Sequence, residues 1–367
     1  MKVRYSYLKD QFRNPDGIFD NLRDLVKTGD YTLGSAVEEF EERFAELIGV
    51  PYAVGVNSGT DALFLSLKAL GIGPGDEVIT VPNTFIATVG AIVATGAKPV
   101  FVDVMDDFTI DPALIEAAFT RKTRAILPVH YAGHPADMTE IMGSAEQFGL
   151  QVVEDACQAI SASIEDRCVG TFGIAGGFSL HPLKNLNVWG DGGIIVTGSK
   201  ELKNKLNLLR NHGLKNRDEV EICGFNSRLD TLQAVVGNYL INDMESVTET
   251  RIKWALRIDR GIAGLGEYLK VPRRKPDRRY VYHLYMLMAQ DRDRLLAFLN
   301  NKGIEAKIHY PIPLHLQKAF QFLGYQKGDF PVTESQTASI ITLPVHQHLN
   351  EGQVDFMIES LHEFYGT

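Results

Sequence analysis

The chain has 367 residues, of which 45% are hydrophobic and 23% are charged. This length allows two or three domains with substantial cores, and the composition is that of an ordinary globular protein. The 46 acidic residues outnumber the 37 basic ones and give a formal net charge of −9. Such a charge disfavours non-specific binding to nucleic acid or to acidic membranes.

The N-terminus and the cysteines bear on the cellular compartment. Residues 1–6 lack the apolar core of a signal peptide, and the most apolar run, 86–97, is too short to cross a bilayer. Cys157, Cys168 and Cys223 cannot all pair with one another and form no C-x-x-C motif. We therefore expect a cytoplasmic protein with free thiols, without a membrane segment, a nucleic-acid partner or a bound metal.

The first part of the chain shows helical spacing of apolar residues. Residues 1–30 are predicted to form an N-terminal arm with one helix at 17–28. Between residues 37 and 47, four apolar side chains recur at helical spacing while glutamates occupy the opposite face. Ser35 is a suitable N-cap for this second helix.

From residue 53 onward, β-rich runs alternate with helical ones. The predicted strands are 53–56, 77–81, 99–103, 124–129, 151–154, 175–180 and 193–197, and helices at 60–70, 84–94, 112–119 and 137–149 separate the first five. This alternation predicts an α/β domain with a largely parallel sheet. The last strands follow one another too closely for helical crossovers, so at least one of them should run antiparallel.

The rest of the chain is predicted to form a long helix and a smaller domain. Residues 229–265 are helical in pattern and are expected to link two domains. Beyond them, strands at 280–288 and 306–309 mix with helices at 292–301 and 351–364, which indicates an α+β domain. The predicted division is an arm at 1–30, a large domain at 31–245, and a linking helix with a small C-terminal domain at 246–367.

Two charged residues follow neighbouring predicted strands. Asp155 ends one strand, and Lys184 comes a few residues after the next. Side chains at such strand ends can share one cleft in α/β proteins. A lysine beside an acid suits pyridoxal 5'-phosphate, because the lysine forms a Schiff base and the acid keeps the pyridine nitrogen protonated. Taken singly, a lysine is usually a solvated surface residue and a strand-end aspartate is often a turn or capping residue, so neither alone carries a cofactor assignment.

Further residues fit a cofactor site, and each has an ordinary alternative. Gly59 lies where the first predicted strand turns into a helix, and a helix N-terminus is a good seat for a phosphate. Helix capping by Ser58 or Thr60 explains the same stretch. Phe85 is either a core aromatic or a ring that stacks on a planar ligand. Gln158 is either a donor to a phenolic oxygen or a surface amide.

Five motifs occur in a recognisable order along the chain. They are SGTDAL at 58–63, GPGDEV at 73–78, TFIAT at 84–88, EDACQA at 154–159 and HPLKN at 181–185. Together they resemble the DegT/DnrJ/EryC1/StrS family of pyridoxal-phosphate-dependent sugar aminotransferases, which have fold type I, and the resemblance runs from about residue 33 to residue 309. It implies a seven-stranded, mainly parallel sheet in a large domain, a small C-terminal α+β domain, and a homodimer with shared active sites.

The resemblance also implies roles for single residues. Lys184 is implied to be the Schiff-base lysine and Asp155 the partner of the pyridine nitrogen. The other implied cofactor contacts are Gln158 at the ring hydroxyl, Phe85 on the ring face, Gly59, Thr60 and Ser179 at the phosphate, and Asn226 at the phosphate in the partner subunit. Related sugar dehydratases carry histidine where this chain has Lys184, so transamination is favoured. Leu180 and Leu183 depart from the Phe and Thr that are more frequent in the family.

Two more motifs bear on the substrate. NSRLD at 226–230 and HYPIPL at 309–314 look similar to enzymes that aminate the 3-keto position of nucleotide-linked sugars, with L-glutamate as the implied amino donor. Arg228 is then a contact to a diphosphate or sugar carboxylate, or else an interface ion pair. His309 is either a substrate contact or a satisfied loop histidine, and Tyr310 beside it is grouped with the substrate-binding residues.

Three other functions are compatible with parts of this sequence. An aminotransferase for a cyclitol or another non-nucleotide keto sugar shares the same chemistry. A pyridoxal-phosphate-binding sensor without turnover is disfavoured as a transcription regulator, because the chain shows no DNA-binding helix pair and is acidic. A dinucleotide-dependent oxidoreductase needs a glycine fingerprint, but GIGPG at 71–75 follows a helix and contains proline.

Overall fold

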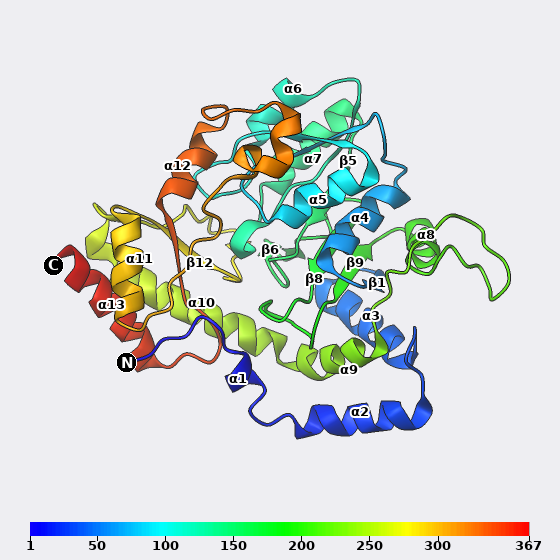
Figure 1. Ribbon diagram of the computed structural model, residues 1–367, viewed down its shortest axis with the longest axis horizontal. Helices are drawn as coiled ribbons and strands as arrows, with labels where there is room; N and C mark the ends of the chain where they lie inside the picture. Colours follow the sequence, from blue (N-terminus) through cyan, green and yellow to red (C-terminus); the bar gives the residue numbers. More distant parts are fainter. Residues whose placement is uncertain (367) are drawn as a thin grey trace.

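The structure is a computed structural model that describes residues 1–366, and a seven-stranded sheet lies at its centre (Figure 1). The strand order is β1-β9-β8-β5-β4-β2-β3. The strands are β1 (Tyr52–Val56), β2 (Glu77–Thr80), β3 (Lys98–Phe101), β4 (Thr123–Ile126), β5 (Gln151–Asp155), β8 (Ala175–Ser179) and β9 (Gly193–Thr197). Only β9 runs antiparallel to its neighbours. All seven predicted strands are confirmed, as is the antiparallel one, since no helix separates β8 from β9.

Helices surround this sheet and fix the direction of its strands. The connecting helices are α4 (Gly59–Ala69), α5 (Ile86–Thr95), α6 (Ile115–Ala118) after a short 3-10 turn (Pro112–Leu114), and α7 (Met138–Phe148). The helix α8 (Lys200–Arg210) was not predicted. The helix α3 (Ser35–Ile48) packs on β1, but Gly34 is its N-cap. The prediction that Ser35 caps α3 is wrong, because Ser35 is the first helical residue and its backbone N–H donates to Asp30.

A second, three-stranded antiparallel sheet forms in the C-terminal part of the chain. Its strands are β10 (Leu269–Lys270), β12 (Tyr285–Ala289) and β13 (Ile340–Leu343). They enclose a separate apolar core with α10 (Met244–Gly261), α11 (Arg292–Asn301) and α13 (Glu351–Tyr365). The remaining helix of this region is α12 (Pro331–Ser339). The architecture is therefore the α/β fold with a small α+β part that the resemblance implied, while the domain boundaries stay a prediction.

Two predicted strands in this region need correction. Residues 306–309 form no strand, because only Lys307 makes a bridge, to Thr342. The predicted strand 280–288 begins only at Tyr285. Before that residue, the backbone N–H groups of Val281 and Leu284 donate to the loop at 131–133 and not to a sheet. Further upstream, β11 (Arg278–Arg279) joins the small sheet of β6 (Ser163–Ile164) and β7 (Arg167–Cys168).

The long helical region and the N-terminal arm connect the two sheets. Within 229–265, α9 (Thr231–Leu240) leads through a 3-10 turn (Ile241–Asp243) into α10, as Figure 1 shows in yellow-green above α2 (Asp16–Thr28). The arm carries α1 (Leu8–Gln11) and α2, the latter close to its predicted bounds. No helix within residues 1–366 combines the length and the apolar character that a bilayer crossing requires.

A buried carboxylate holds the loop that precedes β8. Glu154 is fully buried and accepts backbone N–H bonds from Gly170, Phe172 and Gly173 at 2.6–2.7 Å. The Nε2 atom of His130 lies 2.9 Å from the same carboxylate. Because the backbone N–H of Ala136 donates to Nδ1 of His130, Nε2 carries the ring proton and donates to Glu154.

Replacing Glu154 with glutamine is therefore expected to destabilise the fold. An amide has one acceptor oxygen where the carboxylate has two, and its NH2 group faces N–H donors. Breaking such a buried network costs about 3–5 kcal/mol in the free energy of unfolding, measured by urea denaturation. The matched control, Glu146→Gln on the exposed face of α7, should change it by less than about 0.5 kcal/mol. Equal stability of the two variants contradicts this account of the loop.

Candidate active site

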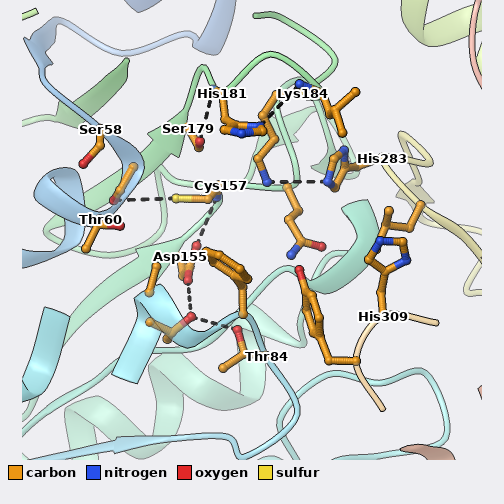
Figure 2. A pocket seen from close by; sticks show the side chains of 18 of the residues that line it. Ser58, Thr60, Thr84, Asp155, Cys157, Ser179, His181, Lys184, His283 and His309 are labelled. Carbon is orange, nitrogen blue, oxygen red and sulfur yellow. Dashed lines mark hydrogen bonds between the residues drawn. The ribbon is translucent and has the colours of Figure 1, made fainter. Parts of the chain in front are cut away.

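A cavity of about 330 Å³ lies at the carboxyl ends of β5 and β8, facing the N-terminus of α4 (Figure 2). Nine of the eleven predicted site residues line it: Gly59, Thr60, Phe85, Asp155, Gln158, Ser179, Lys184, His309 and Tyr310. The other two, Asn226 and Arg228, do not. Residues that sequence reasoning did not assign also line it, among them Tyr5, Thr84, Thr88, Cys157, His181 and His283.

Asp155 is buried at the end of β5, and both of its carboxylate oxygens are held. The hydroxyl of Thr88 donates to Oδ2 at 2.7 Å, and the backbone N–H of Cys157 donates to Oδ1 at 3.1 Å. The hydroxyl of Thr84 lies 2.7 Å from that of Thr88. These contacts fix the direction of the carboxylate within the cavity.

Lys184 lies in the loop after β8, and its backbone is anchored. The hydroxyl of Tyr7 and the side-chain amide of Asn187 both donate to its carbonyl oxygen, at 2.9 and 3.1 Å. Its Nζ atom lies 3.5 Å from Nε2 of His283 (Figure 2). Loss of water around the amine lowers the pKa of Lys184, although Cys157 and Asp155 act in the opposite direction. A lowered pKa increases the fraction of neutral amine, which is the nucleophilic form.

The N-terminus of α4 abuts the end of β8 and suits an anion. The side chain of Ser58 accepts the backbone N–H of Asp61 and is the helix cap, as one of the two sequence interpretations held. A Cβ atom on Gly59 would lie 2.6 Å from Cβ of Ser179, so only glycine allows this close approach. The capped helix end still presents its positive dipole to the cavity, so capping by Ser58 is compatible with a phosphate seat, which stays a prediction.

Aromatic and polar groups form the opposite wall. Phe85 is 49% exposed, so it is not a core aromatic, and its ring lies 5.7 Å from that of Tyr310. Gln158 is buried and accepts the backbone N–H of Ala132 at 2.7 Å, which excludes a surface amide. The Nδ1 atom of His309 lies 3.0 Å from the hydroxyl of Thr342, and burial lowers the pKa of His309 to about 4.

Asn226 and Arg228 lie outside this cavity in the single chain. Asn226 is exposed, and Arg228 donates to the side-chain oxygen of Asn211 at 2.9 Å. Between them, the hydroxyl of Ser227 donates to the carboxylate of Asp61 at 2.7 Å. The segment is thus anchored beside α4, with Asn226 directed to solvent within one chain.

Comparison with known proteins identifies the family of the chain. The model of the DegT/DnrJ/EryC1/StrS aminotransferase family matches residues 15–362. The chain belongs to this family.

Curated relatives and solved structures match over nearly the whole chain. The dTDP-3-amino-3,4,6-trideoxy-alpha-D-glucose transaminase of Streptomyces venezuelae is 42% identical over 93% of this chain and 90% of its own length. A pleiotropic regulatory protein of Geobacillus stearothermophilus is 41% identical over 94% of this chain and 93% of its own length. The crystal structure of S. venezuelae DesV in complex with a ketimine intermediate is 40% identical and covers 99% of this chain and 98% of that one, with a TM-score of 0.96.

Membership of the DegT/DnrJ/EryC1/StrS family confirms the sequence prediction of fold and of enzyme class: the chain is a sugar aminotransferase. The sequence did not assign the other lining residues because their place in the cavity depends on tertiary packing. His283 lies in a stretch predicted as a strand, and Tyr5 lies in the N-terminal arm. Thr88 belongs to a quoted motif, but its bond to Asp155 depends on how α5 packs beside β5.

Proposed function

We propose that this aminotransferase uses pyridoxal 5'-phosphate to move an amino group from L-glutamate to the 3-keto position of a nucleotide-linked sugar. The observation that carries the proposal is the meeting, in one cavity, of the Lys184 amine, the Asp155 carboxylate and the N-terminus of α4. These supply the three groups that the cofactor needs: an amine for its aldehyde, an acid for its ring nitrogen and a seat for its phosphate.

The residues present fit this cofactor. The Gly59–Ser179 contact leaves no room for a side chain at the mouth of α4, so an anion can approach the helix end closely. The exposed ring of Phe85 offers a flat surface beside Asp155, and Gln158 borders the same space. When bound, pyridoxal phosphate supplies an aldehyde and a ring that accepts electrons.

The chain's own residues then position groups and move protons. Asp155, held by Thr88 and Cys157, places its carboxylate where it stabilises a protonated ring nitrogen. The neutral amine of Lys184 takes the proton from the α-carbon of the donor and later returns one, as a general base and acid. The first turn of α4 and Ser179 hold the phosphate, and Phe85 covers the ring and limits access of water.

We also propose that two chains build each site in a homodimer. The cavity of one chain contains neither Asn226 nor Arg228, although Asn226 carries amide donors and Arg228 a permanent positive charge. Asn226 is exposed and Arg228 is half-buried, and Ser227 between them bonds to Asp61 of α4, where a partner related by two-fold symmetry can approach.

Mixing two inactive variants should restore activity if the sites are shared. Lys184→Ala is combined with an Asn226→Ala, Arg228→Ala double variant, each inactive alone. Heterodimers then contain one site with both defects and one with neither, so up to about half of the wild-type rate per dimer should return. Subunit exchange is followed by native mass spectrometry. No recovery after proven exchange, or an active monomer, refutes the shared site.

The substrate assignment rests on the motifs around Asn226 and His309 and on the name of the Streptomyces relative. A panel tests it: dTDP- and UDP-linked 3-keto sugars, their 4-keto isomers, and free keto-cyclitols, each with L-glutamate. We expect amination of a 3-keto nucleotide sugar only. Turnover of cyclitols alone, or of 4-keto sugars alone, overturns the substrate proposal.

The same panel addresses a regulatory role, since a regulatory protein is among the relatives. A sensor without turnover binds the cofactor and yields a yellow protein, but glutamate does not bleach the colour. The aminotransferase is expected to lose its yellow colour with glutamate and to regain it with the keto sugar.

A further inference from the structure

A second, smaller cavity lies behind the wall of the active-site pocket. It has a volume of about 10 Å³, which is close to what one water molecule needs. Its lining consists of Tyr5, Tyr7, Leu183, Arg251, His283, Leu284, Leu343 and Val345. His283 therefore borders both this cavity and the pocket that holds Lys184.

Two buried polar atoms of the small cavity's lining residues lack a hydrogen bond of ordinary geometry within the described chain: Nδ1 of His283 and Nη2 of Arg251. The side chain of Tyr7 also lies close to the Arg251 guanidinium. The rest of the Arg251 guanidinium is fixed. Its Nη1 donates to the carbonyl oxygens of Tyr282 and Val345 at 3.1 Å, and its Nε donates to Gln347 at 3.2 Å. Buried polar groups are rarely left unpaired, and both residues line the small cavity, so one water molecule held there can serve both atoms.

The chemistry of the neighbours determines the tautomer of His283. Arg251 and a protonated Lys184 can only donate hydrogen bonds. Nε2 of His283, 3.5 Å from Nζ of Lys184, must then be the acceptor, and Nδ1 carries the proton and donates to the water. Burial, followed by the charges of Lys184 and Arg251, lowers the pKa of His283 well below its ordinary value, so the ring stays neutral.

We propose that His283, oriented by Arg251 through one buried water molecule, is a positioning residue that accepts a hydrogen bond from Lys184 whenever that amine is free and protonated. The inference rests on the role of Lys184 proposed above. The contact holds the amine beside Asp155 and keeps the transferred proton on Nζ, because the neutral ring resists taking it. A distance of 3.5 Å is at the long end of the hydrogen-bonding range, and a small rotation of the flexible lysine side chain shortens it.

The pKa of Lys184 in the cofactor-free protein tests this proposal directly. It is measured by competitive acetylation over a range of pH, with mass spectrometry of the modified peptides. The titratable groups that face Lys184 are Asp155, Cys157, His181, His283 and His309. The exposed Lys205 on α8 is the internal reference in every sample.

Two variants of His283 separate the hydrogen bond from mere packing. His283→Leu removes the acceptor and should lower the pKa of Lys184 by about one unit, so that Lys184 is acetylated about 10-fold faster below its midpoint. His283→Gln places an amide oxygen near the position of Nε2 and should restore most of the wild-type value. Lys205 should not change in either variant.

An unchanged pKa of Lys184 in His283→Leu overturns the proposal, as does a glutamine variant that behaves like the leucine variant. A high-resolution crystal structure of the cofactor-free protein should show one ordered water between His283 and Arg251. An empty cavity would refute the proposal that Arg251 orients His283. Neither experiment uses cofactor or substrate. A failure here is therefore distinct from a failure of the aminotransferase proposal, which falls if Lys184→Ala retains turnover.

Discussion

Replacing Lys184 with alanine is expected to lower kcat by about 10³-fold or more while pyridoxal phosphate still binds non-covalently. General acid–base catalysis by one side chain contributes about 10²–10⁴-fold, and Lys184 also holds the cofactor's aldehyde. The substitution does not change the proposed phosphate seat at α4 or the ring contact of Phe85, so the cofactor should still bind. Single-turnover kinetics and the absorbance of the desalted protein measure the two quantities.

The control for this variant is Lys205→Ala on the exposed side of α8. It changes the same residue type away from the cavity and should keep the wild-type rate. Borohydride reduction should attach the cofactor to Lys184 in the wild type and in the control, and to no residue in Lys184→Ala. Undiminished turnover by Lys184→Ala is incompatible with the proposed mechanism.

Replacing Asp155 with asparagine is expected to lower kcat by about 10²-fold or more with little change in stability. The amide keeps the shape and can still accept from Thr88 and Cys157, but it carries no charge to stabilise a protonated ring nitrogen. Removal of one preorganised electrostatic contact costs about 10²–10³-fold in other enzymes. Steady-state kinetics and urea denaturation, run on the same preparation, separate the two effects.

Thr88→Val provides a matched comparison for Asp155→Asn. It removes one donor to the carboxylate but keeps its charge, so its loss of kcat should be smaller than that of Asp155→Asn. If asparagine at 155 supports the wild-type rate, the carboxylate has a structural role and the assignment of the ring partner is wrong.

The sequence predicted most of the sheet because its strands are buried and because helices with clear periodicity separate the first five of them. It failed where tertiary contacts override local pattern. Residues 280–284 look like a strand, yet Val281 and Leu284 bond to the loop at 131–133. Residues 306–309 also have strand composition, but Lys307 alone pairs with β13.

The candidate site shows the same limit. The sequence predicts both Asp155 and Lys184 as site residues, because each belongs to a motif at the end of a predicted strand. These two strands, β5 and β8, are neighbours in the sheet, so both side chains can reach one cavity. The contacts of Tyr7, Thr88 and His283 join segments separated by 67 to 177 positions, and no spacing in the sequence encodes them. The places of Asn226 and Arg228 depend on a second chain and stay a prediction.

The most direct test of the central claim follows the nitrogen atom itself. The protein is loaded with pyridoxal phosphate and given L-[15N]glutamate with a nucleotide-linked 3-keto sugar, and the sugar product is analysed by mass spectrometry. The account predicts an amino sugar that carries 15N, formed with an equal amount of 2-oxoglutarate, and no such product with Lys184→Ala. A folded, yellow wild-type protein that leaves the sugar without 15N, across all keto sugars of the panel, contradicts it.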